Sequence, residues 1–209
     1  MFDWLGDILS GLGDALSVVF EGVGADIAVD IWNALVEWID KEVLDAFSYR
    51  GLVYESADYH NAVFVGTDRE GNPRHIHKRS TAAQGGFKGN APGSEPEYSF
   101  HWIGGGDTLF LFEAPIDMLS FISMHKQHWK SSSYAAACGV SDKVLWKTME
   151  GRPFIRNVCI CLDNDETGQK AAQRISKALT EKNIRNQILV PTRKDWNEDL
   201  LFLRKEDRK

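Results

Sequence analysis

Acidic side chains follow three apolar stretches of this chain, and their spacing makes them candidates for metal-dependent chemistry. Glu113 ends the run LFLFE, and Asp117 follows four residues later. Asp163 and Asp165 end the run NVCICLDND, and Asp195 comes shortly after NQILVP. Carboxylates that are crowded together repel each other unless a cation lies between them, and ligand sets made only of oxygen favour hard ions such as Mg²⁺ or Mn²⁺. The pattern therefore predicts a divalent-metal site that binds substrate phosphates.

A structural interpretation competes with this one for each acid taken singly. An aspartate that follows a strand is often only the N-cap of the next helix, and Asp163 or Asp165 suits that role. The joint occurrence of acids after three separate strands is what favours a site.

The elements that must position these acids alternate regularly from residue 109 onward. Apolar runs predict strands, and segments with helical periodicity predict the helices between them. The strands are expected at 109–113, 133–139, 157–163 and 186–191, and the helices at 116–128, 142–149, 166–182 and 196–203. This alternation predicts an α/β fold with a parallel sheet that helices cover on both faces. Ligands of such sheets bind at the carboxyl ends of the strands, where the acids lie.

A basic stretch precedes this region. Residues 62–79 read as a β-hairpin, and no acid occurs between Glu70 and Glu95. The interval contains several glycines and four basic side chains: Arg74, Lys78, Arg79 and Lys88. Either the stretch is a solvated basic strand face, or it binds phosphates. Lys194 has the same two interpretations, as a surface lysine or as a phosphate ligand beside the last acids.

Charge is distributed unevenly along the 209 residues. The net charge is −6, but residues 1–47 hold ten acids and one base, so the remainder carries +3. Residues 1–47 show two amphipathic helical segments separated by glycines, which predicts a helical hairpin. An interfacial membrane helix is not favoured because its polar face is acidic, and a secretory signal is not expected. The odd count of three cysteines, two of them within an apolar run, indicates a reduced, cytoplasmic protein.

Two of the acidic motifs resemble a known family. FLFEAPIDMLS and CLDNDETGQKAA are similar to the Toprim domain of DnaG-type primases, with Glu113 closing one strand and Asp163 and Asp165 closing another. Ala114 stands where the family usually has glycine. AACGVS and KDWNEDL are similar to further motifs of the primase branch. Upstream, VFVGTDREGNPRHIHKRST resembles the basic subdomain of unknown function that precedes Toprim in proteins of plasmids and conjugative elements.

The resemblance implies Mg²⁺-dependent (or Mn²⁺-dependent) nucleotidyl transfer on nucleic acid. It gives Glu113, Asp163 and Asp165 the catalytic role, and Asp117 and Asp195 a further metal position. It also implies that the basic side chains contact either the backbone of a nucleic acid, most simply single-stranded DNA, or an incoming triphosphate. Replication or conjugation proteins are possible partners. The charge pattern and the resemblance together suggest three parts: an acidic helical leader (1–47), which resembles no part of the family, a β-rich basic subdomain (48–105) and a Toprim catalytic domain (106–209). The zinc ribbon and the helicase-binding domain of a complete primase are not expected here.

Two other functions remain open. A Toprim nuclease would use the same acids to nick DNA, and a non-catalytic nucleic-acid-binding module would use them only to hold a metal. A topoisomerase is disfavoured because the length leaves no room for a tyrosine-bearing cleavage domain. No zinc site is expected from the histidines and cysteines. His75 and His77 are expected to contact phosphate or solvent, and the cysteine pair Cys159 and Cys161 to lie in the core.

Overall fold

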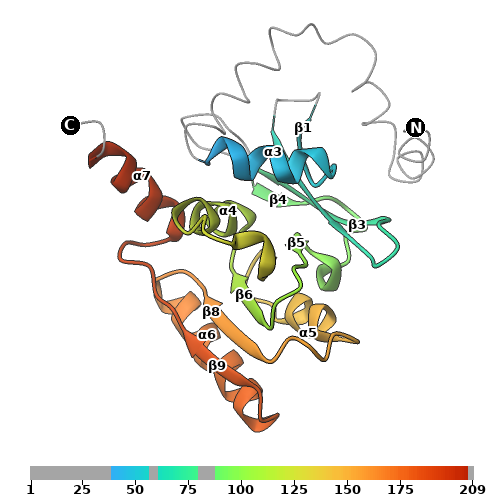
Figure 1. Ribbon diagram of the computed structural model, residues 1–209, viewed down its shortest axis with the longest axis vertical. Coiled ribbons are helices and arrows are strands. Elements are labelled where there is room, and N and C mark those ends of the chain that lie inside the picture. Colours follow the sequence, from blue (N-terminus) through green and yellow to red (C-terminus); the bar gives the residue numbers. More distant parts are fainter. Residues whose placement is uncertain (1–38, 57–60, 80–87, 207–209) are drawn as a thin grey trace, which may run out of the picture.

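Two β-sheets organise the computed structural model, which describes residues 39–56, 61–79 and 88–206 (Figure 1). One sheet has four strands and the other has five. The helical hairpin predicted over 1–47 lies outside the described residues except for its final part. No helix within the described ranges is long and apolar enough to cross a membrane.

The smaller sheet is antiparallel throughout, with the strand order β1-β2-β3-β4. Its strands are β1 (Val53–Glu55), β2 (Ala62–Thr67), β3 (Pro73–Arg79) and β4 (Lys88–Asn90). The predicted hairpin is therefore present as β2 and β3. Asp68 shapes its turn, because its Oδ1 accepts hydrogen bonds from the backbone N–H groups of Glu70 and Asn72 at 3.1 and 2.8 Å.

The larger sheet has the order β5-β7-β6-β8-β9, and all of its pairs except β5–β7 are parallel. Its strands are β5 (His101–Trp102), β6 (Thr108–Phe112), β7 (Ser133–Ala136), β8 (Asn157–Cys161) and β9 (Arg185–Ile188). The predicted parallel α/β sheet is thus confirmed. The antiparallel edge strand β5 was not predicted, because two residues are too few to show an alternating pattern.

Helices cover both faces of the larger sheet. One face carries α3 (Lys41–Tyr49), α4 (Pro115–Met124) and α7 (Trp196–Glu206), and the other carries α5 (Lys143–Met149) and α6 (Glu166–Glu181). Alternate residues of β6 divide between the two cores: Phe112 packs with α4, whereas Leu109 and Leu111 pack with α5 and α6. Two short 3₁₀ helices, η2 (Pro96–Tyr98) and η3 (Trp129–Ser131), lie in the connections.

The core on the α4 face also joins the two sheets. Phe64 of β2 contacts Phe100, with ring centroids 5.4 Å apart. Phe47 of α3 contacts the same ring at 5.2 Å and stacks on Trp129 at 5.7 Å. The burial of Trp129 also accounts for the end of α4 at Met124, before the predicted position 128, because the chain leaves the helix to place this ring in the core.

Candidate active site at the carboxyl ends of the strands

The candidate acids gather at one edge of the larger sheet. Glu113 directly follows β6, and Asp163 and Asp165 follow β8, which is the parallel neighbour of β6. The loop before α7 is tied to this edge, since the N–H of Asn164 donates to the carbonyl of Lys194 at 2.7 Å. Asp195 therefore joins the acids of the two strands.

Two carboxylate oxygens at this edge are buried without a hydrogen-bond partner in the described structure: Oε2 of Glu113 and Oδ1 of Asp163. Burial, followed by repulsion from Glu113 and Asp195, raises the pKa of Asp163 to about 7. Burial and then Asp165 raise the pKa of Glu113. Removal from water disfavours a negative charge, and nearby negative charges disfavour it further. A cation at this position would relieve both effects.

Asp117 is the most enclosed of the acids. It lies in the first turn of α4, is 3% exposed, and accepts a hydrogen bond from the N–H of Asn197 at 3.2 Å. Burial, then Asp195 and Asp163, raise its pKa well above the usual value. Asn197 also donates to Ser120 Oγ at 3.1 Å, so this contact fixes the start of α7 against α4.

Asp165 and Asp195 also shape the helix starts. Oδ1 of Asp165 accepts the N–H of Gly168 at 2.8 Å and caps α6, so the structural interpretation is correct for this residue. Oδ1 of Asp195 accepts the N–H of Glu198 at 2.8 Å in the same way. Each of these bonds uses one carboxylate oxygen. Capping by one oxygen and metal ligation by the other are compatible.

A glycine allows the loop after β8 to pack closely on α6. A Cβ atom at Gly168 would lie 2.4 Å from the carbonyl oxygen of Asp163, which is far inside van der Waals contact. Any side chain at 168 would therefore displace the backbone that carries Asp163.

Three cationic side chains act on these acids. Burial and neighbouring acids raise the pKa values of Glu113 and Asp117. Lys88 and Lys194 offset part of the rise for Glu113, and Arg79 offsets part of it for Asp117. Arg79 and Lys88 are cross-strand partners in β3 and β4, so this end of the smaller sheet faces the acidic edge. The positive charges are close enough to stabilise ionised carboxylates or to contact a phosphate.

The other two predicted basic residues lie elsewhere on β3. Arg74 is near the opposite end of the strand, where its Nη2 lies 2.5 Å from Glu95 Oε1. Lys78 is paired with Gly89 of β4.

The donor chemistry of the edge suits a hard divalent cation, since every candidate ligand is a carboxylate oxygen. Within 39–56, 61–79 and 88–206, no three His, Cys, Asp or Glu side chains are arranged to hold a metal ion unaided. Mg²⁺ commonly binds proteins through one or two carboxylates and completes its coordination with water and substrate phosphates. The partnerless oxygens of Glu113 and Asp163 fit such a site.

Comparison with known families agrees with this geometry. Residues 110–200, which include all five candidate acids, match the family described as Toprim-like. This match assigns residues 110–200, rather than the whole chain, to a Toprim-like domain. Residues 36–107 match a second family, described as a protein of unknown function (DUF3991). The expected combination of an uncharacterised upstream region with Toprim is therefore confirmed.

A curated relative is the uncharacterized protein pXO2-78 of Bacillus anthracis, whose name carries the plasmid designation pXO2. The two are 28% identical over 157 residues, covering 69% of this chain and 45% of the relative. The chain thus spans about half the length of that protein.

Solved structures with the same fold include several primases. The DnaG catalytic core matches with a TM-score of 0.61 and 13% identity, covering 97% of this chain and 76% of its own. The primase fragment of the bacteriophage T7 primase-helicase matches with a TM-score of 0.59 and 18% identity, covering 83% and 70%. A DnaG primase catalytic domain bound to single-stranded DNA matches with a TM-score of 0.56 and 12% identity, covering 98% and 75%.

One expectation about the basic stretch is wrong. His75 and His77 are 1% and 6% exposed, so they do not reach solvent or an external phosphate. They lie on β3, an inner strand of the smaller sheet, and burial lowers the pKa of His75 to about 4. By contrast, Cys159 and Cys161 are buried as predicted.

Sequence reasoning also missed polar residues that hold the site together. Asn164 and Asn197 link the loop after β8 and the helix α4 to the segment around Asp195. Both asparagines lie within the acidic motifs of the sequence, but only the carboxylates of those motifs were candidate metal ligands.

Proposed function

We propose that this Toprim domain is a primase-like nucleotidyltransferase core that carries out Mg²⁺-dependent (or Mn²⁺-dependent) phosphoryl transfer on nucleic acid. The observation that supports this most directly is the pair of buried, partnerless oxygens on Glu113 and Asp163, set among further carboxylates and facing lysines. Such a cluster is unfavourable in the free protein and suits a site completed by a cation and phosphate.

Glu113, Asp163 and Asp165 would hold the ion, and Asp117 and Asp195 would provide a second position or orient water. The chemistry that a divalent ion would supply there is neutralisation of the negative charge on a substrate phosphate during in-line displacement. Glu113 also suits proton transfer, since its raised pKa brings it closer to neutral pH, where a carboxylate can accept a proton from an attacking hydroxyl.

Lys88, Lys194 and Arg79 would contact the phosphate backbone beside the acids. Lys78 and Arg74 lie on the other face of β3 and would contact phosphate, if at all, outside this edge. Single-stranded DNA is the proposed substrate strand, as in the ligand named for one DnaG structure of this fold. The plasmid designation in the name of the Bacillus anthracis relative suggests a role in mobile-element DNA metabolism in the cytoplasm, with replication or conjugation proteins as partners.

A primer-synthesis gel tests this function. The purified chain is incubated with single-stranded template, labelled nucleotides and Mg²⁺ or Mn²⁺, beside an Asp163→Asn/Asp165→Asn variant. Asp107→Asn is the matched control, because Asp107 lies before β6, at the opposite end of the sheet. We expect metal-dependent products from the wild type and the control only.

Two results would contradict the proposal. Metal-dependent cleavage of end-labelled template without synthesis would assign the same acids to a nuclease. DNA binding with neither activity would assign the chain to the non-catalytic binding modules.

A further inference from the structure

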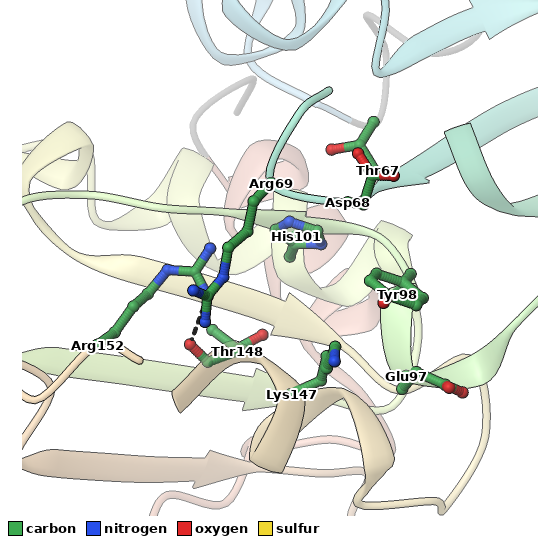
Figure 2. A pocket seen from close by; sticks show the side chains of 9 residues that line it. All are labelled: Thr67, Asp68, Arg69, Glu97, Tyr98, His101, Lys147, Thr148 and Arg152. Carbon is green, nitrogen blue, oxygen red and sulfur yellow. Dashed lines mark hydrogen bonds between the residues drawn. The ribbon is translucent and has the colours of Figure 1, made fainter. Parts of the chain in front are cut away.

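A second polar pocket lies at the β5 edge of the larger sheet, where the two sheets meet (Figure 2). Its walls come from the β2–β3 turn, η2, β5 and the end of α5, so segments far apart in the sequence build it. None of the candidate acids or the lysines that face them lines this pocket. It is a feature separate from the site at the strand ends.

Two arginines from different elements converge in this pocket. Figure 2 shows the guanidinium groups of Arg69, from the turn, and Arg152, after α5, next to each other. Arg69 donates from Nη2 to the carbonyl oxygen of Glu150, and Arg152 donates from Nη1 to that of Thr148 at 2.7 Å. Both acceptors are neutral main-chain oxygens. Burial, followed by repulsion from Arg69, lowers the pKa of Arg152, which indicates that the two charges act on each other.

The acids that line the pocket are directed elsewhere. Asp68 already accepts three hydrogen bonds within its own turn, from Glu70 N, Asn72 N and Asn72 Nδ2. The carboxylate of Glu97 points away from the two guanidinium groups in Figure 2. The pocket's third cation, Lys147, forms an ion pair with Glu150 at 2.8 Å. The charge of Glu150 also acts on Arg69, but among the described residues neither Arg69 nor Arg152 forms an ion pair.

The backbone near Arg152 accommodates the approach of Arg69. Gly151 has a φ of +62°, and a Cβ at this position would lie 2.6 Å from Nη2 of Arg69. A residue with a side chain would be strained there and would push the guanidinium group out of the pocket. The pairing of the arginines thus depends on a specific local backbone.

We propose that this pocket binds a phosphate group, held between Arg69 and Arg152. Guanidinium groups present planar, forked donors that match phosphate oxygens, and an anion between two of them removes their repulsion. The phosphate belongs either to a free nucleotide or to a nucleic-acid strand, and the chemistry recognised is the same. The inference does not depend on the catalytic role proposed for the acids, because no residue is shared between the two sites.

The test follows the side-chain Nε–H signals of arginine by NMR while inorganic phosphate is titrated into the full chain with EDTA present. We expect saturable shifts of the Arg69 and Arg152 signals, and at least a fivefold loss of affinity in both Arg69→Gln and Arg152→Gln. Arg69 is exposed, so its substitution leaves the fold intact, and thermal unfolding verifies this for both variants. Arg185→Gln is the matched control, since Arg185 is exposed on β9, at the opposite edge of the sheet.

Two further titrations, with ATP and with a twelve-residue thymidine oligonucleotide, identify the source of the phosphate. If ATP binds more tightly than the oligonucleotide, the phosphate belongs to a nucleotide, and if the oligonucleotide binds more tightly, it belongs to a strand. In either case the tighter binding must be weakened in Arg69→Gln and Arg152→Gln. Unshifted Arg69 and Arg152 signals, or equal affinities in the wild type and both variants, would overturn the proposal.

Discussion

In the folded protein, ionisation of the Asp163 side chain is unfavourable. Among the described residues its buried Oδ1 has no hydrogen-bond partner, and its pKa of about 7 reflects burial and the surrounding acids. The protonated form is thus favoured in the folded protein over the pH range in which the unfolded chain, with a value near 3.8, is already ionised. Folding stability contributed by this group is complete below pH 3.8 and is lost as the pH rises through about 7.

The first prediction follows from this loss of stability with rising pH. Asp163→Asn removes the ionisation. Urea denaturation in EDTA should therefore show that the free energy of unfolding of the variant, relative to that of the wild type, increases as the pH rises from 5 to 8. The expected increase in this difference is about 1–3 kcal/mol, because a pKa shift of one unit corresponds to roughly 1.4 kcal/mol. Asp107→Asn serves as the control and should show no such increase. A constant difference between Asp163→Asn and wild type at both pH values would contradict the electrostatic account.

At the scale of elements, two loops and the helices that follow them position the acids. The close contact of Gly168 with the Asp163 carbonyl sets the loop after β8, and Trp196 sets the start of α7. The indole Nε1 of Trp196 donates to the carbonyl of Cys161 at 2.9 Å, at the end of β8. The geometry of the site therefore depends on residues that carry no charge.

The second prediction concerns the close contact at Gly168. Gly168→Ala should displace the Asp163 backbone, destabilise the protein by about 1–3 kcal/mol as overpacking does, and reduce metal-dependent synthesis at least tenfold. Gly105→Ala is the control, because nothing lies within 4 Å of its added Cβ. Equal activity and stability of the two variants would show that the contact has no role.

The third prediction concerns the indole contact. Trp196→Phe keeps an aromatic ring but leaves the Cys161 carbonyl without this donor, which should cost about 1–3 kcal/mol in thermal or urea unfolding. Trp146→Phe loses a bond of the same length, from Nε1 to Asp142 Oδ2 at 2.9 Å, in a less buried setting. Its cost should be clearly smaller, and a larger cost there would contradict the assignment.

Particular elements show what the sequence reveals and what it does not. The runs around β6 and β8 are apolar and end in acids, so strand type and the site at their ends were both predictable. The pairing of β5 and the end of α4 depend on long-range packing of Trp102 and Trp129, which local periodicity does not report. The spacing of the basic residues along β3 does not reveal that Arg79 faces the acids whereas Arg74 faces Glu95. The direction in which each side chain points is set by the position of the strand in the folded sheet.

At the scale of the molecule, a shared aromatic core holds the smaller sheet over the acidic edge of the larger one. Phe47, Phe64 and Phe100 join α3 and β2 to the segment that enters β5. This arrangement brings Arg79 and Lys88 from the upstream region to acids of the Toprim domain. If the proposed function is correct, the two parts of the chain together form one surface for a phosphate backbone.

The fourth prediction tests this surface. Lys88→Gln should weaken binding of a fluorescent single-stranded oligonucleotide, measured by anisotropy across a series of KCl concentrations. Its slope of log affinity against log salt should fall by about 0.7, as expected for the loss of one phosphate contact on a single strand. Lys177→Gln, on the exposed side of α6, should behave as wild type. An unchanged slope for Lys88→Gln would remove this residue from the interface.

The most direct test of the account is whether the acidic edge binds a divalent cation. Mn²⁺ binding, followed by electron paramagnetic resonance of the free ion, can be compared for wild type, Asp163→Asn/Asp165→Asn and Asp107→Asn. We expect saturable binding to the wild type and to Asp107→Asn, and at least a tenfold weaker affinity in the double variant. Equal Mn²⁺ affinity in all three proteins would contradict a metal-dependent site at the ends of β6 and β8.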